Sequence, residues 1–439
     1  MTNRVCVIDA AGQRLAPCTA KRARRLRDAG KAKRVYHAPY TIQLVHTVEN
    51  PTPCPLEIRL DPGSKTTGIA VVATYARGDV VIWAGEIHHR GHQITSDLEK
   101  RAAARRNRRS RKWYRRPKFR YLPKGANGYS FGRADGWLPP SLMSRVYNVE
   151  TWAKRLMRWM PITSIAVETV RFDMQKLRNP EIAGVEYQHG TLFGTEVREY
   201  VLRKWGHECA YCGAQNCPLE LEHILAKSCG GSDAVSNLTL ACVPCNKAKD
   251  NLPIEVFLKR KPERLARIQK QRLAPLRDAA AVNATRYAIG DRLKALELPV
   301  SFWSGGRTKF NRTSQGYDKA HWLDAACVGD RGDNVALETT RPLQIRAAGH
   351  GTRQRVTMNK HGFPRSAARA RAKRVHDFQV GDYVTLCQPA GKYRGVHQGH
   401  LVSVRARGDF DLRTRCGLKI TAPHHRYTRR HRDDGYRYA

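Results

Sequence analysis

Cys209-Ala-Tyr-Cys212 and, 29 residues later, Cys242-Val-Pro-Cys245 decide how the middle of this chain folds. Four thiolates at this spacing are typical of a closed, tetrahedral zinc site. Such a site leaves no open coordination position, so we expect this zinc to be structural and to hold together a small domain that lacks enough core of its own. Any catalysis in the segment must then come from other residues.

Candidate catalytic side chains lie between and just after the cysteine pairs: Glu222-His223, Asn237 and Asn246. A neutral imidazole can take a proton near pH 7, and a hard cation prefers oxygen ligands. The pattern resembles the HNH nuclease family, which often has Asp where this chain has Glu222. The resemblance implies a ββα-metal finger in which His223 is the general base, Glu222 and Asn246 ligate one Mg²⁺, and Asn237 orients the histidine loop. A zinc ribbon that binds nucleic acid without cutting would leave His223 and Asn246 unexplained.

The charge of the chain points to a polyanionic partner. Lys and Arg total 79 against 38 Asp and Glu, which gives a formal net charge of +41 over 439 residues. Such an excess repels itself unless a polyanion screens it, and nucleic acid is the expected polyanion. A chain that is basic merely for solubility would carry dozens of unbalanced cations to no purpose. The length exceeds what one core usually supports, so we expect about two to four domains.

Cysteine usage and hydropathy indicate an intracellular protein. No run approaches the roughly 18 apolar residues of a membrane span, and the first residues lack the apolar region of a signal peptide. Twelve cysteines, four of them paired as C-x-x-C, favour metal ligation in a reducing compartment over disulfides.

Hydrophobic patterning predicts a small α+β module first, with a basic helix over residues 19–33. Three antiparallel strands are then expected at 56–60, 68–73 and 80–87, with Asp61-Pro62-Gly63 closing the first. Later elements are a helix at 141–160, a strand at 162–170, helical pattern at 266–298, a strand with a Gly-rich turn at 301–310, a helix at 317–328 and a small β-barrel from about 340.

A long basic helix follows the three strands. Ser96 to Glu99 forms an S-x-x-E capping box, and we expect the helix to end at Pro117. Charge runs are usually solvated faces, but here cations occupy nearly every face with few acids to pair them, which favours bound phosphate. The candidate nucleic-acid-binding residues are Arg101, Arg105, Arg106, Arg108, Arg109, Arg111, Lys112, Arg115 and Arg116.

A second candidate centre is dispersed along the chain. Asp61 ends one strand, Glu168 ends another, and His321 and Asp324 share one face of a late helix. Taken singly, each is explained by a turn or a solvated charge. In this order they resemble the three split motifs of a RuvC-like RNase H fold. That resemblance implies that Asp61, Glu168 and Asp324 hold two Mg²⁺ ions about 4 Å apart, with His321 assisting as a proton shuttle.

The order of these parts resembles the IscB family of transposon-associated, RNA-guided nucleases, which are related to type II CRISPR effectors. Leu15-Ala16-Pro17-Cys18 stands where that family has Pro-Leu-Met-Pro. The resemblance implies an α/β multi-domain fold, an RNase H-like RuvC fold split by a ββα-metal HNH insertion. Its expected parts are an N-terminal module (1–52), RuvC part I (53–94), an Arg-rich bridge helix (95–120), RuvC part II (121–194), the HNH domain with its zinc site (195–258), RuvC part III (259–338) and a β-barrel-like domain (339–439).

The same resemblance implies a function. A guide RNA (omega RNA) would pair with one strand of a double-stranded DNA target; the HNH centre would cut that strand and the RuvC centre the displaced one. The barrel, including Lys392-Tyr393-Arg394-Gly395, would help to read a motif adjacent to the target. The protein would act as a monomeric ribonucleoprotein in the cytoplasm of a prokaryote, at the nucleoid.

Two other functions compete with this one. A nuclease that recognises DNA structure or sequence directly, as resolvases and homing endonucleases do, would be active without co-purified RNA. A non-cutting RNA-binding scaffold would keep both folds without their chemistry. Against the scaffold, all the acids that cutting needs, together with His223, are present.

Overall fold

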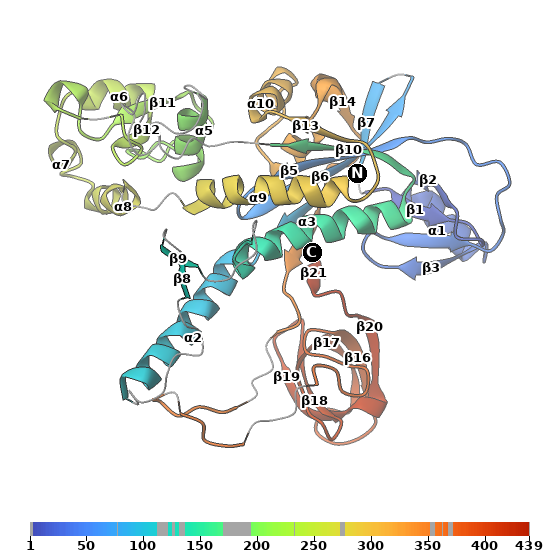
Figure 1. Cartoon of the computed structure of the whole chain (residues 1–439). Helices are drawn as coiled ribbons and strands as arrows, with labels where there is room; N and C mark the ends of the chain where they lie inside the picture. Colours follow the sequence, from blue (N-terminus) through green and yellow to red (C-terminus); the bar gives the residue numbers. More distant parts are fainter. Residues whose placement is uncertain are drawn as a thin grey trace.

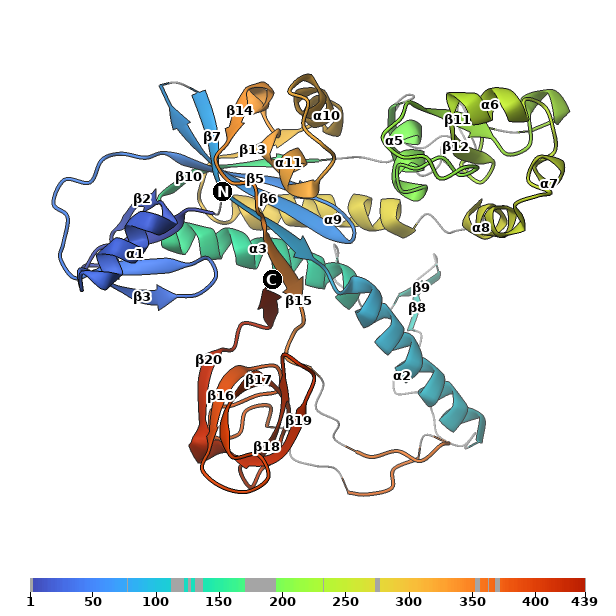
Figure 2. The ribbon, with the colours of Figure 1, turned by 180° about the vertical axis from the view of Figure 1, so that it is seen from behind.

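The structure is a computed structural model. It describes residues 3–76, 78–111, 122–124, 128–130, 137–169, 195–231, 233–272, 277–351, 356–361, 363–367 and 372–438. A central sheet with helices on both faces forms the body; a small N-terminal sheet, the cysteine-rich region and a C-terminal sheet surround it (Figures 1 and 2). The fold is therefore mixed α/β, as expected.

The N-terminal module is a four-stranded sheet with one helix. Its strands are β1 (Val5–Ile8), β2 (Arg14–Cys18), β3 (Ala32–Tyr36) and β4 (Thr41–Leu44), in the order β2-β1-β4-β3. Thr19 caps α1 (Ala20–Asp28) by accepting a hydrogen bond from the backbone N–H of Arg22. The helix thus ends at Asp28, earlier than predicted, and Lys33 lies in β3 instead.

The central sheet contains the predicted meander. Its strands run in the order β13-β10-β5-β6-β7-β15-β21, and β14 also pairs with β7. β5, β6 and β7 are antiparallel, whereas β10 runs parallel to both β5 and β13. The bounds are β5 (Leu56–Pro62), β6 (Thr66–Tyr75), β7 (Gly78–His88), β10 (Ile162–Glu168), β13 (Val300–Trp303), β14 (Val335–Leu337), β15 (Leu343–Ala347) and β21 (Tyr436–Tyr438).

The two faces of this sheet bury different helices. Ile58 and Leu60 of β5 lie in one core with residues of α3 (Pro140–Trp159) and α9 (Arg277–Lys294). On the other face, α11 (His321–Ala326) packs its apolar residues against β6 and β7. Because side chains alternate along a strand, Asp61 lies on the α11 face.

Gly68 in β6 permits the close approach of α11. A Cβ atom at this position would lie 1.8 Å from the backbone carbonyl oxygen of His321. Gly68 is also the register partner of Asp61 in β5. The missing side chain therefore lets the start of α11 lie directly beside Asp61.

The basic helix differs from the prediction at its start. α2 runs from Gly91 to Arg111, so Ser96 lies inside the helix and is not its N-cap. The capping-box prediction is wrong because the helix continues from the end of β7 after a break of only two residues. The predicted end at Pro117 lies outside the described residues; beyond them, β8 (Leu122–Lys124) pairs with β9 (Gly128–Ser130).

Three later segments also differ. The strand predicted at 301–310 ends at Trp303, because Ser304 caps α10 (Gly305–Ser314) by accepting from the backbone N–H of Arg307. The helical pattern predicted at 266–298 corresponds to α8 (Pro262–Arg272), which begins four residues earlier, and to α9; residues 273–276 between them lie outside the description. The late helix is shorter than predicted, since α11 covers only His321–Ala326.

The C-terminal region forms a five-stranded antiparallel sheet that is curled in Figure 1. Its core includes Phe410. Its order is β19-β18-β17-β16-β20, with β16 (Tyr383–Gln388), β17 (Gly395–Val404), β18 (Asp409–Thr414), β19 (Lys419–His424) and β20 (Thr428–Arg432). β15 and β21 flank this unit in sequence yet pair with each other in the central sheet.

Across the described part of the chain, no helix has the length and apolar character that a membrane crossing requires.

We predict that Gly68→Ala destabilises the body by about 1–3 kcal/mol, because the added methyl group forces α11 away from β6. Chemical denaturation followed by circular dichroism measures the change. Gly306→Ala is the matched control, since a Cβ there meets no atom within 4 Å. Equal stability of Gly68→Ala and the unmodified protein would contradict the proposed close packing.

Candidate functional site

The four paired cysteines form one cluster. The sulfur atoms of Cys209, Cys212, Cys242 and Cys245 all lie within 4.8 Å of one another. Burial opposes ionisation of Cys209, but backbone hydrogen bonds from Cys242 and Cys212 outweigh it and lower its pKa to about 7. Four thiols in this arrangement suit a tetrahedral Zn²⁺ and suggest a zinc site.

A short hairpin and a helix carry the second pair. β11 (Leu219–His223) pairs antiparallel with β12 (Leu238–Cys242), and α6 (Val243–Lys249) follows directly. α5 (Thr195–Lys204) and α7 (Ile254–Phe257) flank them. Trp205 is buried beneath the hairpin and donates its indole N–H to the carbonyl of Leu238 at 3.1 Å. This packing gives the region a core of its own.

Three of the residues predicted from sequence meet at one cavity. Glu222 and His223 at the end of β11 and Asn246 in α6 line a space of about 350 Å³. The pairing of β11 with β12 and the start of α6 immediately afterwards bring them together. The cavity also contains oxygen-bearing side chains of Asp250 and Asn251.

Lys249 is a member of this site that sequence reasoning missed. Its fully buried ammonium donates to Oε1 of Glu222 at 2.7 Å and to the backbone carbonyl of His223 at 2.8 Å. A buried cation of this kind persists only when paired. Lys249 therefore fixes Glu222 and the backbone of His223 relative to each other. In the sequence, only its position three residues after Asn246 pointed to a role at this site.

His223 has a carboxylate partner that the sequence did not identify. Its Nε2 lies 2.7 Å from Oδ1 of Asp233, and Lys227 contacts the other oxygen of Asp233 at 2.8 Å. The hydrogen bond from Lys227 lowers the pKa of Asp233 against the effect of burial. A carboxylate in this place engages Nε2 and fixes the plane of the ring.

Asn237 braces the loop that follows His223. Its side-chain amide donates to the carbonyl of Leu225 at 2.9 Å, and its Oδ1 accepts from the N–H of Leu225 at 2.9 Å. Asn246, by contrast, donates through Nδ2 to Glu220 at 2.7 Å. That contact leaves the Oδ1 end of Asn246 as the oxygen that a cation would use.

The dispersed carboxylates meet at the central sheet. Nδ1 of His321 lies 3.1 Å from Oδ2 of Asp61. In the parallel pair β5 and β10, Leu60 is opposite Val167, so the next residues, Asp61 and Glu168, lie side by side on the α11 face. Both carboxylates are buried.

Asp324 reaches the same face from α11 and is balanced by two cations. Nε of Arg312 lies 2.8 Å from one of its oxygens, and Nζ of Lys319 lies 2.8 Å from the other. Burial raises the pKa of Asp324, Lys319 opposes the shift, and the charge of Asp61 adds to it. Sequence analysis identified neither cation.

The pKa of His321 also depends on Asp61. Burial alone would lower its pKa, but the hydrogen bond to Asp61 and the charge of Asp61 raise it above the usual value. Behind Asp61, the buried Arg145 donates to the carbonyl of Pro62 at 2.7 Å and fixes the turn after β5.

The candidate nucleic-acid-binding helix is α2, and the side chains of Arg101, Arg105, Arg106 and Arg111 are exposed along it. Arg108 is half-buried, and Arg109 lies in the helix with its side chain outside the description. Lys112, Arg115 and Arg116 lie outside the described residues. The described acids of this helix, Asp97 and Glu99, lie toward its start.

Two family models match the chain. Residues 5–190 match the model described as RRXRR protein, and residues 209–252 match HNH endonuclease. RRXRR domains are found in Cas9- and IscB-like nucleases. The prediction of an HNH domain is thus confirmed, and the two matches together support a Cas9- or IscB-like nuclease.

Similar solved structures include the Type II-C Cas9 of Actinomyces naeslundii, at 13% identity and a TM-score of 0.23, over 86% of this chain and 76% of that one. Another is Streptococcus thermophilus Cas9 in complex with the GGAA PAM, at 13% identity and a TM-score of 0.21, over 63% of this chain. The chain spans about a third of the length of that second enzyme, 33%. Among curated proteins, none is similar enough to count as a match.

We predict that Cys242→Ser abolishes zinc binding and unfolds residues 195–258 while the central sheet stays folded, because each region has its own core. Metal analysis and limited proteolysis measure the two effects. Cys229→Ser, at an exposed cysteine outside the cluster, should change neither. Retention of zinc by Cys242→Ser, or unfolding of the whole chain, would refute the assignment.

Proposed function

We propose that this chain is an RNA-guided DNA endonuclease of the IscB family, with one HNH and one RuvC-like cutting centre. One observation carries the proposal: Glu222, His223 and Asn246, which the resemblance to the HNH family singled out, line one cavity within the segment that matches HNH endonuclease. The reaction is hydrolysis of a phosphodiester by water, with separate residues for each strand.

At the HNH centre, His223 acts as general base on the attacking water. Because Asp233 engages Nε2 and fixes the ring, we assign proton acceptance to Nδ1. Asn237 keeps the loop after His223 in place, and Lys249 holds the backbone carbonyl of His223 itself.

The donors at this cavity fit a hard divalent cation, since they are carboxylate and amide oxygens. Glu222 gives one oxygen to Lys249 and would offer the other to Mg²⁺, together with Asn246. When bound, such an ion neutralises charge that develops on the scissile phosphate.

At the RuvC-like centre, Asp61, Glu168 and Asp324 would hold two Mg²⁺ ions. The fit rests on three buried carboxylates sharing one face of the sheet, where a cation relieves their mutual repulsion. Arg312 and Lys319 keep Asp324 in place. His321 would assist as a proton shuttle; burial lowers its pKa, but the hydrogen bond to Asp61 and the charge of Asp61 raise it above the usual value.

The remaining parts serve the nucleic acids. A net charge of +41 and the exposed arginines of α2 suit the phosphates of a guide RNA and a roughly 20-base-pair heteroduplex, so that base pairing supplies the sequence choice. In this proposal α2 is the bridge helix, and the C-terminal sheet acts as a barrel-like domain that contacts the adjacent motif. The working form is a monomeric ribonucleoprotein with structural Zn²⁺.

Cutting of each strand should depend on its own centre. We predict that Asp61→Ala reduces cutting of the displaced strand by more than about a hundredfold, and that His223→Ala does so for the guide-paired strand. Strand-resolved gels measure both, with the exposed Asp330→Ala as control. Loss of both cuts from either single change would contradict independent centres.

The scaffold function has its own test. If the unmodified protein, with its guide and Mg²⁺, leaves a matching duplex uncut, the scaffold function is favoured.

If the protein is RNA-guided, its guide RNA should co-purify with it. We predict that protein expressed from a native-like locus retains one structured RNA encoded beside its gene, since neutralised phosphates release bound counterions and stabilise the complex. Extraction and sequencing identify the RNA. Heterogeneous RNA that salt removes, with cutting retained, would instead indicate a nuclease that recognises DNA directly.

A further inference from the structure

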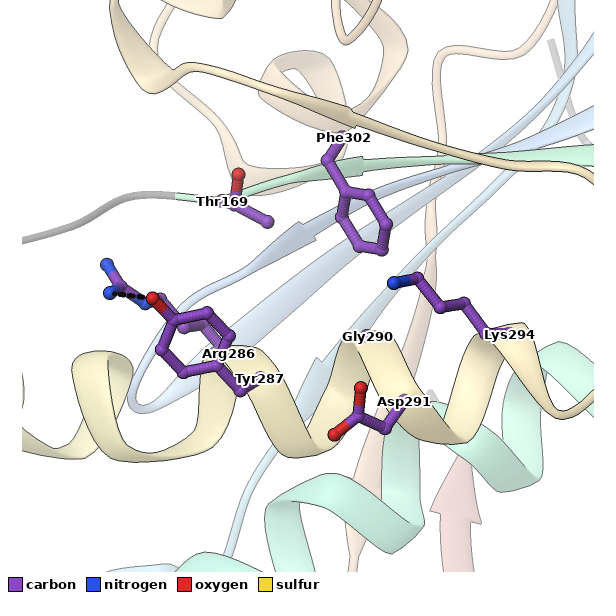
Figure 3. A pocket seen from close by; sticks show the side chains of 7 residues that line it. All are labelled: Thr169, Arg286, Tyr287, Gly290, Asp291, Lys294 and Phe302. Atoms are coloured by element: carbon purple, nitrogen blue, oxygen red, sulfur yellow. Dashed lines mark hydrogen bonds between the residues drawn. The ribbon is translucent and has the colours of Figure 1, made fainter.

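A second cavity, of about 360 Å³, lies at the carboxyl ends of β10 and β13, beside α9 (Figure 3). Thr169 and Phe302 border it from the strand side, and Tyr287 and Lys294 border it from the helix. None of these residues belongs to either candidate centre. In size the cavity lies within the range of ligand pockets, roughly 300–1,000 Å³.

The cavity is close to the RuvC-like centre but on the other face of the sheet. Thr169 directly follows Glu168, and side chains alternate in direction along a strand. Phe302 pairs in register with Val167, whose side chain lies in the core beneath α9. A polymer that crosses this edge of the sheet therefore meets Glu168 on one face and the cavity on the other.

Two exposed aromatic rings border the cavity. Tyr287 is 67% exposed and Phe302 is 39% exposed. Most of the Tyr287 side chain and more than a third of Phe302 stay in water, so core packing alone does not account for these exposed ring surfaces. Aromatic rings at a positively charged surface are typical of sites where unpaired bases stack.

The charges at the cavity favour an anion. The guanidinium carbon of Arg286 lies 4.4 Å from the centre of the Tyr287 ring, and Nζ of Lys294 lies 5.2 Å from the centre of the Phe302 ring. Asp291 is the acid among the lining residues. The two cations outweigh it, and each lies beside one of the rings on which a base would stack.

The Phe302 ring rests against the helix backbone. A Cβ atom at Gly290 would lie 3.1 Å from Cε1 of the ring, so glycine permits this contact. The ring therefore packs on α9 on one side, whereas Tyr287 stands out from α9 in Figure 3. A ring that is already packed on one side loses less conformational entropy when a base binds.

We propose that this cavity takes an unpaired nucleotide of the DNA strand that the Asp61, Glu168 and Asp324 centre cuts. The inference rests on the proposed function for the identity of the strand. DNA is favoured over guide RNA because the cavity adjoins Glu168, where the strand to be cut must pass.

Site-directed photocrosslinking tests this proposal. The probe is a single-stranded oligodeoxynucleotide that contains 5-bromodeoxyuridine, mixed with the full chain as purified and without added Mg²⁺, so that cutting is prevented while the zinc site is kept. We expect mass spectrometry to find the crosslink on peptides that contain Tyr287 or Phe302. Tyr287→Ala should lower this crosslink about tenfold, and Tyr287→Phe should restore it.

Tyr147→Ala is the matched control, because Tyr147 is 48% exposed with Arg292 over its ring at 5.4 Å but lies outside the cavity. It should leave the crosslink unchanged. Crosslinks confined to other segments, an equal loss in Tyr147→Ala, or no loss in Tyr287→Ala would overturn the proposal. So would preferential crosslinking of the matching bromouridine RNA.

Cutting is measured separately, so the two proposals can fail separately. A Tyr287 crosslink that persists while Asp61→Ala still cuts both strands supports the nucleotide site and refutes the RuvC-like centre. Normal strand cutting that depends on Asp61, without the crosslink, refutes the nucleotide site alone.

Discussion

The parallel pairing of β5 with β10 is the constraint on which the body depends. It places Asp61 beside Glu168 at one edge of the sheet, although more than a hundred residues separate them along the chain. Gly68 then lets α11 lie against the neighbouring strand, which brings His321 within 3.1 Å of Asp61 and Asp324 onto the same face. Buried like charges repel, so this gathering requires a stable sheet and helix beneath it.

The two candidate centres balance their negative charge in different ways. At the cysteine-rich domain, one fully buried ammonium, that of Lys249, compensates Glu222. At the central sheet, Arg312 and Lys319 share Asp324. Each arrangement holds carboxylates in position and keeps their charge paired. Removing one partner of a buried ion pair destabilises a protein far more than the intact pair stabilises it. The cations are therefore structural members of each site.

Short stretches of sequence predicted much of the local structure of this protein, whereas they predicted few of its contacts between residues distant in the chain. The C-x-x-C pairs, the three antiparallel strands and the late helix with His321 are visible in short windows of sequence. Lys249 and Arg312 resemble ordinary surface cations there, because only folding shows which charges become buried. Ser96 has the form of a helix cap but lies inside α2, since the preceding residues continue the helix. The sequence did not predict that β15 pairs with β21, because the hydrophobic periodicity of a strand does not show which distant strand it will pair with.

That last pairing affects how the chain folds as it is synthesised. β15 borders β7 on one side, and its other side stays open until β21 emerges, after the entire five-stranded unit has been translated. An unpaired strand edge is a template for association with other chains. Tyr436 of β21 then donates a hydrogen bond to Asn148 of α3, so the late strand closes both the sheet and the helix layer. Until β21 is made, β15 therefore has one unpaired edge, of the kind through which incompletely folded chains associate.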